Sequence, residues 1–260
     1  MNYQTICLEK KDHVGLLHLN RPQVLNALSE EMRSELLHVL QQAAADDGLR
    51  VLVITGKGRA FSAGGDLNLF KHRYESYQRG GSDDTFLNLD LPRAFSQFPK
   101  PMIAAINGPA VGFGITMPLN CDVRIASTQA QFSFAFARLG LTPEFGSSYF
   151  LPRLIGYAKA AELIFTARTL DAQEALQIGL VNRVVAHADL LAEAGKMAVE
   201  IARMPAGAIR AAKQVLRHGS HSTLEQVLAH EALTFQRAAQ TQDHYDAVCR
   251  TLAQIKSAHR

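Results

Sequence analysis

The fold is decided by one stretch, residues 103–148, which reads IAAINGPAVGFGITMPLNCDVRIASTQAQFSFAFARLGLTPEFGSS. It overlaps a short apolar run, Met102–Ile106, whose length and composition predict a buried strand. An Asn-Gly-Pro turn at 107–109 ends that strand, and the apolar segment 115–119 predicts a buried helix beyond it. A strand, a glycine-bearing turn and a helix start leave main-chain N–H groups without intrahelical partners. The turn is therefore a candidate site for an anion, or for an oxygen on which negative charge develops.

A single carboxylate follows at Glu144, in the sequence Leu-Gly-Leu-Thr-Pro-Glu. Its neighbours are largely apolar, and a carboxylate that lacks water and a cation has a raised pKa, which suits proton transfer near neutral pH. A structural role is the alternative, because a carboxylate ahead of residues 146–148 can interact with the dipole of the next helix. The leading hypothesis joins the turn and Glu144 into one site, with donors for an oxyanion and one acid/base beside them.

A second glycine-bearing turn, GKGRAFSAGGDL at 56–67, follows another short apolar strand predicted at 51–55. Paired glycines permit a close approach of the backbone to a ligand, and Asp66 is a candidate cap for the helix that follows. The segment is not a P-loop, because it lacks Lys-Ser/Thr after its last glycine. These residues alone leave open whether the turn binds a ligand or is only a tight turn.

Strands and helices alternate up to about residue 185, and only helices follow. This order predicts an α/β core over residues 1–188 and a C-terminal helical subdomain over residues 189–260. Ser29 and Asp171 are expected to cap helices. The expected strands are 3–9, 14–19, 51–55, 102–106, 122–126 and 131–133; the expected helices are 30–45, 86–98 with an interruption at Pro92, 115–119, 158–166, 190–203, 207–218 and 224–255; and 72–85 is expected to be an irregular loop.

Composition excludes several classes of protein. The chain has 260 residues, 47% of them hydrophobic, and a formal net charge of +3, which is typical of a globular protein with a sizeable core. There is no Trp and no long basic run, so we expect no nucleic-acid partner. Nor do we expect a membrane partner, since no apolar run approaches about 18 residues. Cys7, Cys121 and Cys249 are far apart, which favours reduced thiols in a cytoplasmic protein and no metal site.

Five segments in the same order resemble the crotonase family, the enoyl-CoA hydratase/isomerase superfamily. They are LNRPQVLNAL, GKGRAFSAGGDL, KPMIAAINGPAVGFGITMPLNCDVRIAS, AQFSFAFARLGLTPEFGSSYFLPRLIG and LDAQEALQIGLVNRVV. The resemblance covers nearly the whole chain. It implies a crotonase-like spiral of ββα units with a C-terminal helical trimerisation region, and hence a homotrimer or a dimer of trimers. It also implies an acyl-CoA thioester substrate, with no cofactor besides the CoA of the substrate itself.

The resemblance further implies which residues form the site. By position, the main-chain amides of Gly65 and Phe113 would form an oxyanion hole for the thioester carbonyl, and Glu144 would be the proton-transfer group. Phe136 would be part of an apolar wall, whether of the core or of an acyl pocket. The residues expected to line the substrate path are Ala27, Ala63, Gly64, Gly65, Asp66, Leu67 and Phe136.

Hydratases of this family resemble one another in carrying two glutamates, at the positions that Thr116 and Phe136 occupy here. The Pro-Glu-x-Gly-Ser-Ser context of Glu144 instead resembles Δ3-Δ2-enoyl-CoA isomerases, in which one carboxylate removes a proton from C2 and returns it to C4. We therefore expect an isomerase that moves a 3-enoyl double bond to trans-2. The alternatives are an enoyl-CoA hydratase that uses Glu144 alone, another acyl-CoA lyase or isomerase of the family, and a non-catalytic member that binds acyl-CoA or RNA.

Overall fold

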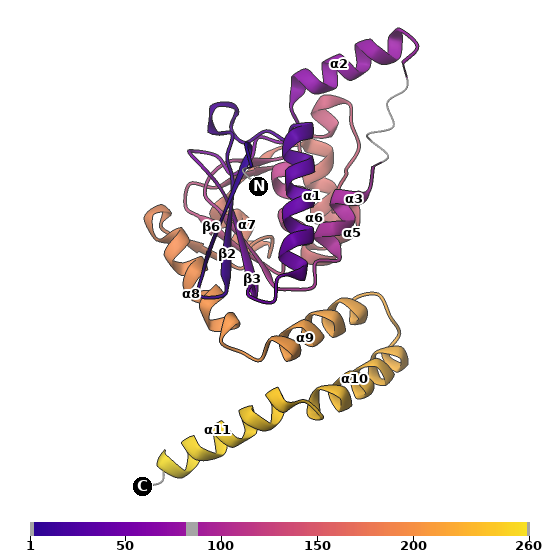
Figure 1. Ribbon diagram of the computed structural model, residues 1–260. Coiled ribbons are helices and arrows are strands. Elements are labelled where there is room, and N and C mark those ends of the chain that lie inside the picture. The colour runs from indigo at the N-terminus through magenta and orange to yellow at the C-terminus, as the bar shows by residue number, and fades with distance from the viewer. Residues whose placement is uncertain (1–2, 82–87, 259–260) are drawn as a thin grey trace.

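A six-stranded sheet lies at the centre of the molecule (Figure 1), whose computed structural model describes residues 3–81 and 88–258. The strands are β1 (Ile6–Lys11), β2 (Val14–Leu19), β3 (Val51–Gly56), β4 (Met102–Ile106), β5 (Ala110–Val111), β6 (Val123–Ser127), β7 (Gln131–Ser133), β8 (Thr169–Asp171) and β9 (Arg183–Val185). The large sheet has the order β1-β2-β3-β4-β6-β9, and a small sheet has the order β5-β7-β8. β1 and β2 form the expected antiparallel hairpin, and the other neighbours in the large sheet run parallel.

Helices cover both faces of the large sheet (Figure 1). The α-helices are α1 (Glu30–Ala45), α2 (Leu67–Gln78), α3 (Asp90–Ser96), α4 (Phe113–Thr116), α5 (Ser147–Ile155), α6 (Tyr157–Thr166), α7 (Ala172–Gln177), α8 (Leu190–Ala202), α9 (Ala206–Gly219), α10 (Leu224–Ala239) and α11 (Gln242–Ala258). Alternate residues of a strand point to opposite faces, so Leu52 and Ile54 of β3 join the core cluster that contains α1, whereas Val51 and Val53 join the cluster that contains α8. This burial on both faces explains why β3 is apolar throughout.

Capping signals in the sequence mark helix starts in the structure. The Ser29 hydroxyl accepts a hydrogen bond from the Met32 amide at 3.2 Å, and α1 begins at the next residue after Ser29. The Asp66 carboxylate accepts from the Asn68 amide at 3.1 Å at the start of α2, and the Asp171 carboxylate accepts from the amide of Glu174 at 2.8 Å at the start of α7. The structure confirms these three caps. They can be predicted from the sequence because an N-cap depends on neighbouring residues alone.

The prediction of an irregular loop at 72–85 was wrong for residues 72–78, because α2 continues to Gln78. Residues 67–78 contain no glycine or proline to stop a helix, and a Lys71–Glu75 pair one turn apart supports it. Residues 82–85 of that loop lie outside the described residues, as do 86 and 87 of the helix expected at 86–98. The interruption expected at Pro92 is absent from α3, because Pro92 falls in its first turn, where the missing N–H has no intrahelical acceptor.

Two other helix predictions needed correction. The helix expected at 115–119 begins earlier, at Phe113, and ends at Thr116, with a 3-10 turn at Pro118–Asn120 beyond it. The single helix expected at 224–255 is two helices, α10 and α11. The break occurs at residues 240–241, where the Thr241 hydroxyl accepts a hydrogen bond from the His244 amide at 3.2 Å and so caps the next helix.

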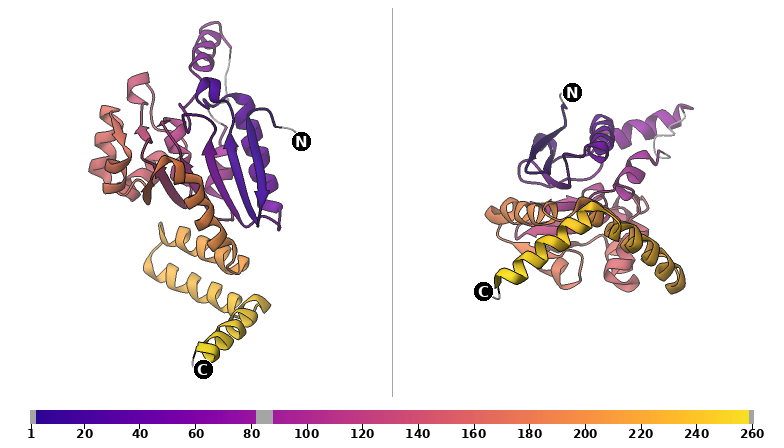
Figure 2. Two further views of the ribbon diagram at one scale, coloured as in Figure 1. Left: turned by 90° about the vertical axis from the view of Figure 1, so that its left-hand side faces the viewer. Right: turned by 60° about the horizontal axis from the view of Figure 1, so that its bottom comes forward.

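The last three helices extend beyond the sheet as an arm (Figure 2). α10 packs along α9, and large apolar side chains such as Leu224, Leu228 and Phe235 remain exposed on the arm. α8, in contrast, packs against the sheet. The domain boundary at residues 188/189 and the trimer stay predictions. In residues 3–81 and 88–258, no helix combines the length and the apolar composition that crossing a membrane requires.

An ion pair between a buried lysine and a more exposed aspartate joins the arm to the core. The ammonium group of Lys213 on α9 donates to the Lys100 carbonyl at 2.6 Å and to the Asp122 carboxylate at 2.7 Å, and Lys213 is 7% exposed. Asp122 also accepts from the Met102 amide at 2.7 Å and lies 3.6 Å from Arg217. Burial lowers the pKa of Lys213, and the nearby Asp122 carboxylate opposes that shift. One α9 side chain therefore holds residues that flank β4 and β6.

Removing the Lys213 ammonium group should lower the stability of the folded protein. We predict that Lys213→Met lowers the free energy of unfolding by about 1–3 kcal/mol, because it leaves the Lys100 carbonyl unpaired and Asp122 with fewer partners. Denaturant unfolding at neutral pH measures the effect. Lys196→Met, an identical change at an exposed position of α8, is the control. Equal stabilities of the two variants would show that the junction contributes nothing to folding.

Candidate active site

The two glycine-bearing turns run side by side. Ser62 and Ala110 form a parallel bridge, and the Val111 amide donates to the Ser62 carbonyl at 2.9 Å. Gly64 follows with φ +101°, and a Cβ placed on it would lie 2.8 Å from the Val111 carbonyl oxygen. Only glycine allows so close an approach of two backbones in this conformation. Gly64 thus lies beside Val111 and Gly112, and Gly65 and Phe113 are the next residues of the two turns.

Two main-chain donors are available where the turns meet. The amides on either side of Gly65 are used in the chain: the Gly64 amide donates to the Ser62 hydroxyl, and the Asp66 amide donates to the Leu28 carbonyl. Within the described residues, neither the Gly65 N–H nor the Phe113 N–H has an acceptor. Phe113 is the first residue of α4, so its N–H cannot bond within that helix. A pair of unbonded donors on adjacent turns can hold an oxygen that gains negative charge.

Glu144 is joined to the same helix turn. The Thr116 hydroxyl donates to Glu144 Oε1 at 2.6 Å, and Thr116, the last residue of α4, is fully buried. The main chain of Glu144 is also held, because its carbonyl accepts from the Ser147 hydroxyl at 2.7 Å and from the Ser147 amide at 3.0 Å. The four residues of α4 therefore connect the Phe113 amide to the carboxylate. No side chain caps the start of α5, so the structure gives Glu144 no capping role there.

The environment of Glu144 favours its protonated form. Desolvation by the surrounding protein raises the pKa of Glu144, while the hydrogen bond from Thr116 and the charge of Arg33 on α1 act to lower it. Glu144 nevertheless remains accessible to solvent. Protein atoms around the carboxylate therefore displace much of its water, and a solute can still reach it from the exposed side. The direction of the shift is the one expected from its apolar sequence neighbours.

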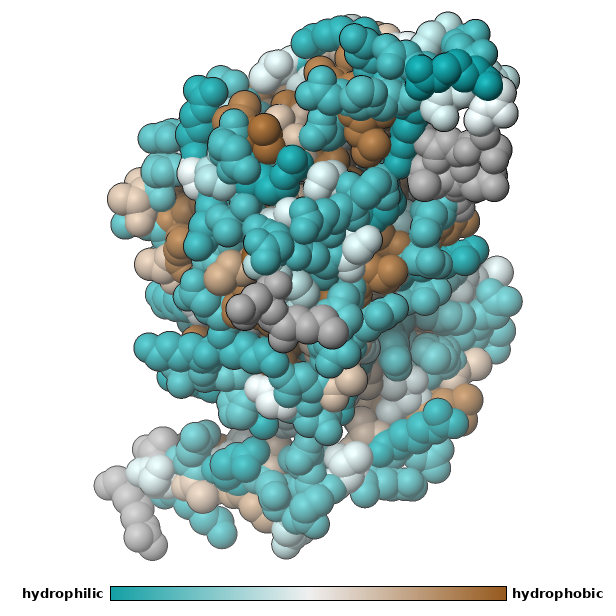
Figure 3. All heavy atoms as spheres, turned by 45° about the horizontal axis from the view of Figure 1, so that its top comes forward, coloured by the Kyte–Doolittle hydropathy of each residue, from teal (hydrophilic) through white to brown (hydrophobic). Residues whose placement is uncertain are grey.

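An apolar cavity of roughly 540 Å³ opens between α2 and the segment that precedes Glu144. Its lining residues are Leu67, Phe70, Arg73, Tyr74, Tyr77, Leu139 and Leu141. Figure 3 shows apolar side chains exposed among hydrophilic ones near the top of the molecule, on the side that carries α2. The residues predicted from sequence to line the substrate path include Leu67 but not Phe70, Arg73, Tyr74 or Tyr77, and the last three lie in 72–85, which was expected to be an irregular loop. The helical spacing of Phe70, Tyr74 and Tyr77 was the signal that could have revealed them.

The remaining predicted residues divide into two groups. Ala27 is buried and precedes Leu28, which forms a bridge with Gly65, so Ala27 and residues 63–67 belong to one neighbourhood. Phe136 is 6% exposed and belongs to the large core cluster together with Phe113. Phe136 is therefore part of the hydrophobic core, and its place in the wall of an acyl pocket stays a prediction.

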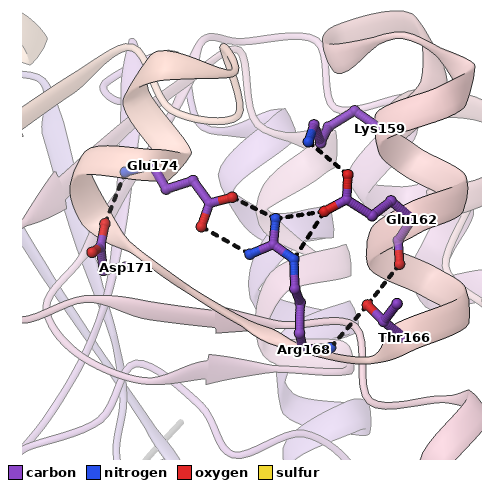
Figure 4. Close-up of polar contacts among 6 residues, drawn as sticks. All are labelled: Lys159, Glu162, Thr166, Arg168, Asp171 and Glu174. Carbon is purple, nitrogen blue, oxygen red and sulfur yellow. Dashed lines mark hydrogen bonds and ion pairs between the residues drawn. The ribbon is translucent and has the colours of Figure 1, made fainter.

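A cluster of charges supports the turn that precedes Phe113. Arg168 donates to the carboxylates of Glu162 on α6 and Glu174 on α7, and Lys159 also binds Glu162 (Figure 4). Arg168 directly precedes β8, which pairs with β7, and the Ser133 carbonyl of β7 accepts from the Gly112 amide at 3.0 Å. The cluster thus fixes the strand against which the Phe113 turn is built. Sequence analysis missed it because no motif marks which charges will meet.

Comparison with known proteins gives one consistent result. Residues 9–252 match the family model described as enoyl-CoA hydratase/isomerase. The chain is similar to the short-chain-enoyl-CoA hydratase of Clostridium acetobutylicum, with 35% identity over 249 residues that cover 95% of this chain and 94% of the relative. It is 34% identical over 260 residues to the crotonyl-CoA hydratase of Syntrophomonas wolfei, covering 99% and 98% of the two chains. The solved structure of an enoyl-CoA hydratase from Bacillus anthracis superposes with a TM-score of 0.88 at 33% identity, covering 96% and 97%.

The raised pKa of Glu144 predicts a cost in stability that depends on pH. Above its folded-state pKa the folded chain carries a poorly solvated carboxylate, whereas below the ordinary value of 4.5 the group is protonated in both states and the cost vanishes. Glu144→Gln should therefore raise Tm near pH 8, and the gain should shrink as the pH falls toward about 4.5. Calorimetry over this range measures it, with Glu200→Gln at an exposed position as the control. A loss of Tm at every pH contradicts the prediction.

Proposed function

The chain belongs to the enoyl-CoA hydratase/isomerase family, and on that premise we propose that it is an isomerase that moves a 3-enoyl-CoA double bond to trans-2. The family and its α/β crotonase-like fold are those expected from the sequence. Closeness to Δ3-Δ2-enoyl-CoA isomerases within the family is not shown by the relatives, which are named as hydratases. The proposal rests on the geometry of the site.

One observation carries the isomerase proposal: the Glu144 carboxylate is bound to Thr116, which lies three residues beyond Phe113 on α4. The two positions where hydratases of the family carry glutamates hold Thr116 and Phe136, and neither can transfer a proton near neutral pH. Adding water calls for one group to hold the water and another to move a proton. Moving a double bond requires one group that takes a proton from one carbon and returns it to another.

The proposed mechanism uses only groups of this chain. The thioester oxygen lies between the N–H groups of Gly65 and Phe113, which stabilise negative charge as it develops. Glu144 removes a proton from C2, and the electron pair of the broken C–H bond delocalises into an enolate held by the two donors. As the thioester carbonyl re-forms, a C2=C3 double bond forms, the electrons of C3=C4 bond the same proton at C4, and Glu144 is ionised again. The reaction is redox-neutral and uses no cofactor.

The acyl chain of the substrate is proposed to occupy the apolar cavity beneath α2. Phe70, Tyr74 and Leu141 offer apolar surface there, and burying methylene groups against such surface stabilises the complex. The thioester and CoA would follow residues 63–67 and the chain near Ala27. Assembly into a homotrimer or a dimer of trimers is proposed through the arm, whose exposed apolar side chains are suited to a second copy.

A second candidate is enoyl-CoA hydratase, and the names of the relatives favour it. In that reaction Glu144 alone would recruit water to the 2-enoyl substrate. The difference between the two candidates is the fate of one substrate: an isomerase produces trans-2-enoyl-CoA, whereas a hydratase consumes it.

The deciding assay incubates the protein with 3-enoyl-CoA and with trans-2-enoyl-CoA in parallel. We expect a fast 3-to-2 shift, little hydration, and a loss of about 10²–10⁴-fold in kcat for Glu144→Gln, because the amide cannot accept the proton. Glu200→Gln, which removes an exposed carboxylate, should keep full activity. Fast hydration without a shift selects the hydratase, and tight binding of both substrates without turnover selects a non-catalytic protein.

The oxyanion hole can be tested with two substitutions at one position. A Cβ on Gly65 would lie 2.5 Å from the Phe70 ring, so Gly65→Ala and Gly65→Pro both disturb that side chain, but only proline removes the N–H. We predict that Gly65→Pro is slower than Gly65→Ala by about 10²–10³-fold in kcat. Circular dichroism checks that both variants fold. Equal rates in two folded variants would refute the assignment of this amide.

A further inference from the structure

We propose that Thr116 is a positioning residue that occupies Glu144 Oε1 and so reserves the other oxygen, Oε2, for proton transfer. The inference rests on the proposed function only in taking Glu144 as the proton-transfer group. Thr116 touches no reacting atom in this scheme, because it acts on the carboxylate. Thr116 occupies a position where hydratases of the family carry a glutamate, and the proposal gives it the task of orienting the Glu144 carboxylate.

The contact leaves one oxygen free. An ionised carboxylate can only accept hydrogen bonds, so the Thr116 hydroxyl must be the donor in the 2.6 Å contact with Oε1. Thr116 is fully buried, so water does not compete for its single hydroxyl proton. Within the described part of the chain, Oε2 of Glu144 has no hydrogen-bond partner, and Glu144 is accessible to solvent. The unbonded oxygen is therefore the one that a substrate can reach.

The frame that carries this contact is fixed on both sides. The amide group of Asn120, which is 3% exposed, donates to the Thr116 carbonyl and to the Phe145 carbonyl, each at 3.2 Å. Phe145 has φ +57°, a left-handed conformation that is unusual for a side chain of this size and that needs support from its surroundings. Asn120 therefore joins the end of α4 to the residue after Glu144. A carboxylate held at its main chain and at Oε1 keeps little freedom beyond motion of Oε2.

This arrangement sets the distance between the two halves of the site. Phe113 and Thr116 are the first and last residues of α4, and three residue steps along a helix rise about 4.5 Å. The oxyanion donor and the support of the base therefore move as one unit. Proton transfer at both C2 and C4 requires one oxygen to reach two carbons while the thioester oxygen stays fixed, and rates fall steeply when such geometry loosens.

The hydroxyl also affects the protonation of Glu144. Its hydrogen bond lowers the pKa of Glu144 against the desolvation that raises it. The charged side chain that acts on Glu144 from a facing element, among the described residues, is Arg33 of α1, and it lowers the pKa as well. Replacing the hydroxyl with a methyl group leaves Arg33 in place and removes one stabiliser of the ionised form. The acidic limb of the pH profile should then move to higher pH.

The test compares Thr116→Val and Thr116→Ser with the wild type, and uses Thr128→Val, the same change at an exposed position, as the control. Profiles of kcat and of kcat/KM against pH are measured on whichever of the 3-enoyl and 2-enoyl substrates the wild type converts. For Thr116→Val we expect kcat to fall about 10–100-fold, with KM little changed and the acidic limb at higher pH. Thr116→Ser, which keeps a hydroxyl, should restore both rate and limb, and Thr128→Val should resemble the wild type.

The outcomes separate this proposal from the proposed function. Wild-type kcat and limb in a folded Thr116→Val overturn it, and so does equal impairment of the Ser and Val variants. Hydration by the wild type would end the isomerase proposal, yet the same profiles would still test Thr116. If the wild type converts neither substrate, infrared titration of the carboxyl band that Glu144→Gln removes replaces the kinetics. Thr116→Val should raise the pKa that it reports, and an unchanged pKa rejects the proposal.

Discussion

The site depends on how closely two main chains approach where residues 62–65 run beside residues 110–113. A Cβ on Gly114 would lie 2.2 Å from the Ser62 carbonyl oxygen, and one on Gly64 would lie 2.8 Å from that of Val111. At such distances no side chain fits between the turns, so the backbones themselves line the site. The N–H groups of Gly65 and Phe113, which have no acceptor among the described residues, belong to these two turns. Donors that the fold holds in place need no reorganisation when charge develops beside them.

Buried polar side chains keep the turns in this arrangement. The amide group of Asn26 donates to the carbonyls of Lys57 and Ala60 at 2.9 Å each, and Asn107 accepts from the Gly56 amide and donates to the Gly58 carbonyl. Both asparagines are buried, and leaving their partners unpaired would cost free energy, so they hold the turn that begins at Gly56 in one conformation. Arg168 performs the corresponding task for the turn that precedes Phe113, through β8 and β7. The two turns are thus supported from different parts of the sequence.

The features that could be predicted from the sequence are those that a short segment determines by itself, such as a strand, a turn or a helix cap. The apolar runs at β3 and β4 and the cap at Ser29 are local signals, and the structure confirms them. Glu144 and the two glycine-bearing turns were also readable, since each is marked by its own residues. The contact between Thr116 and Glu144 was not, because it joins residues 28 positions apart whose pairing depends on how α4 is oriented. The lining of the cavity was missed for a different reason: solvent-facing polar residues in α2 concealed its helical period.

The choice between isomerase and hydratase reduces to the number of oxygens that Glu144 can offer. With Oε1 engaged by Thr116, one oxygen remains for chemistry. An isomerase uses that oxygen twice in succession, first as a base at C2 and then as an acid at C4, so one suffices. A hydratase would need it to hold the water and to take up the water's proton while C2 is protonated from another group. Phe136 offers no such group, and the Thr116 hydroxyl is already committed to Oε1. Under the proposed function one carboxylate oxygen is used twice in sequence, whereas the two relatives described above carry the names of the other reaction.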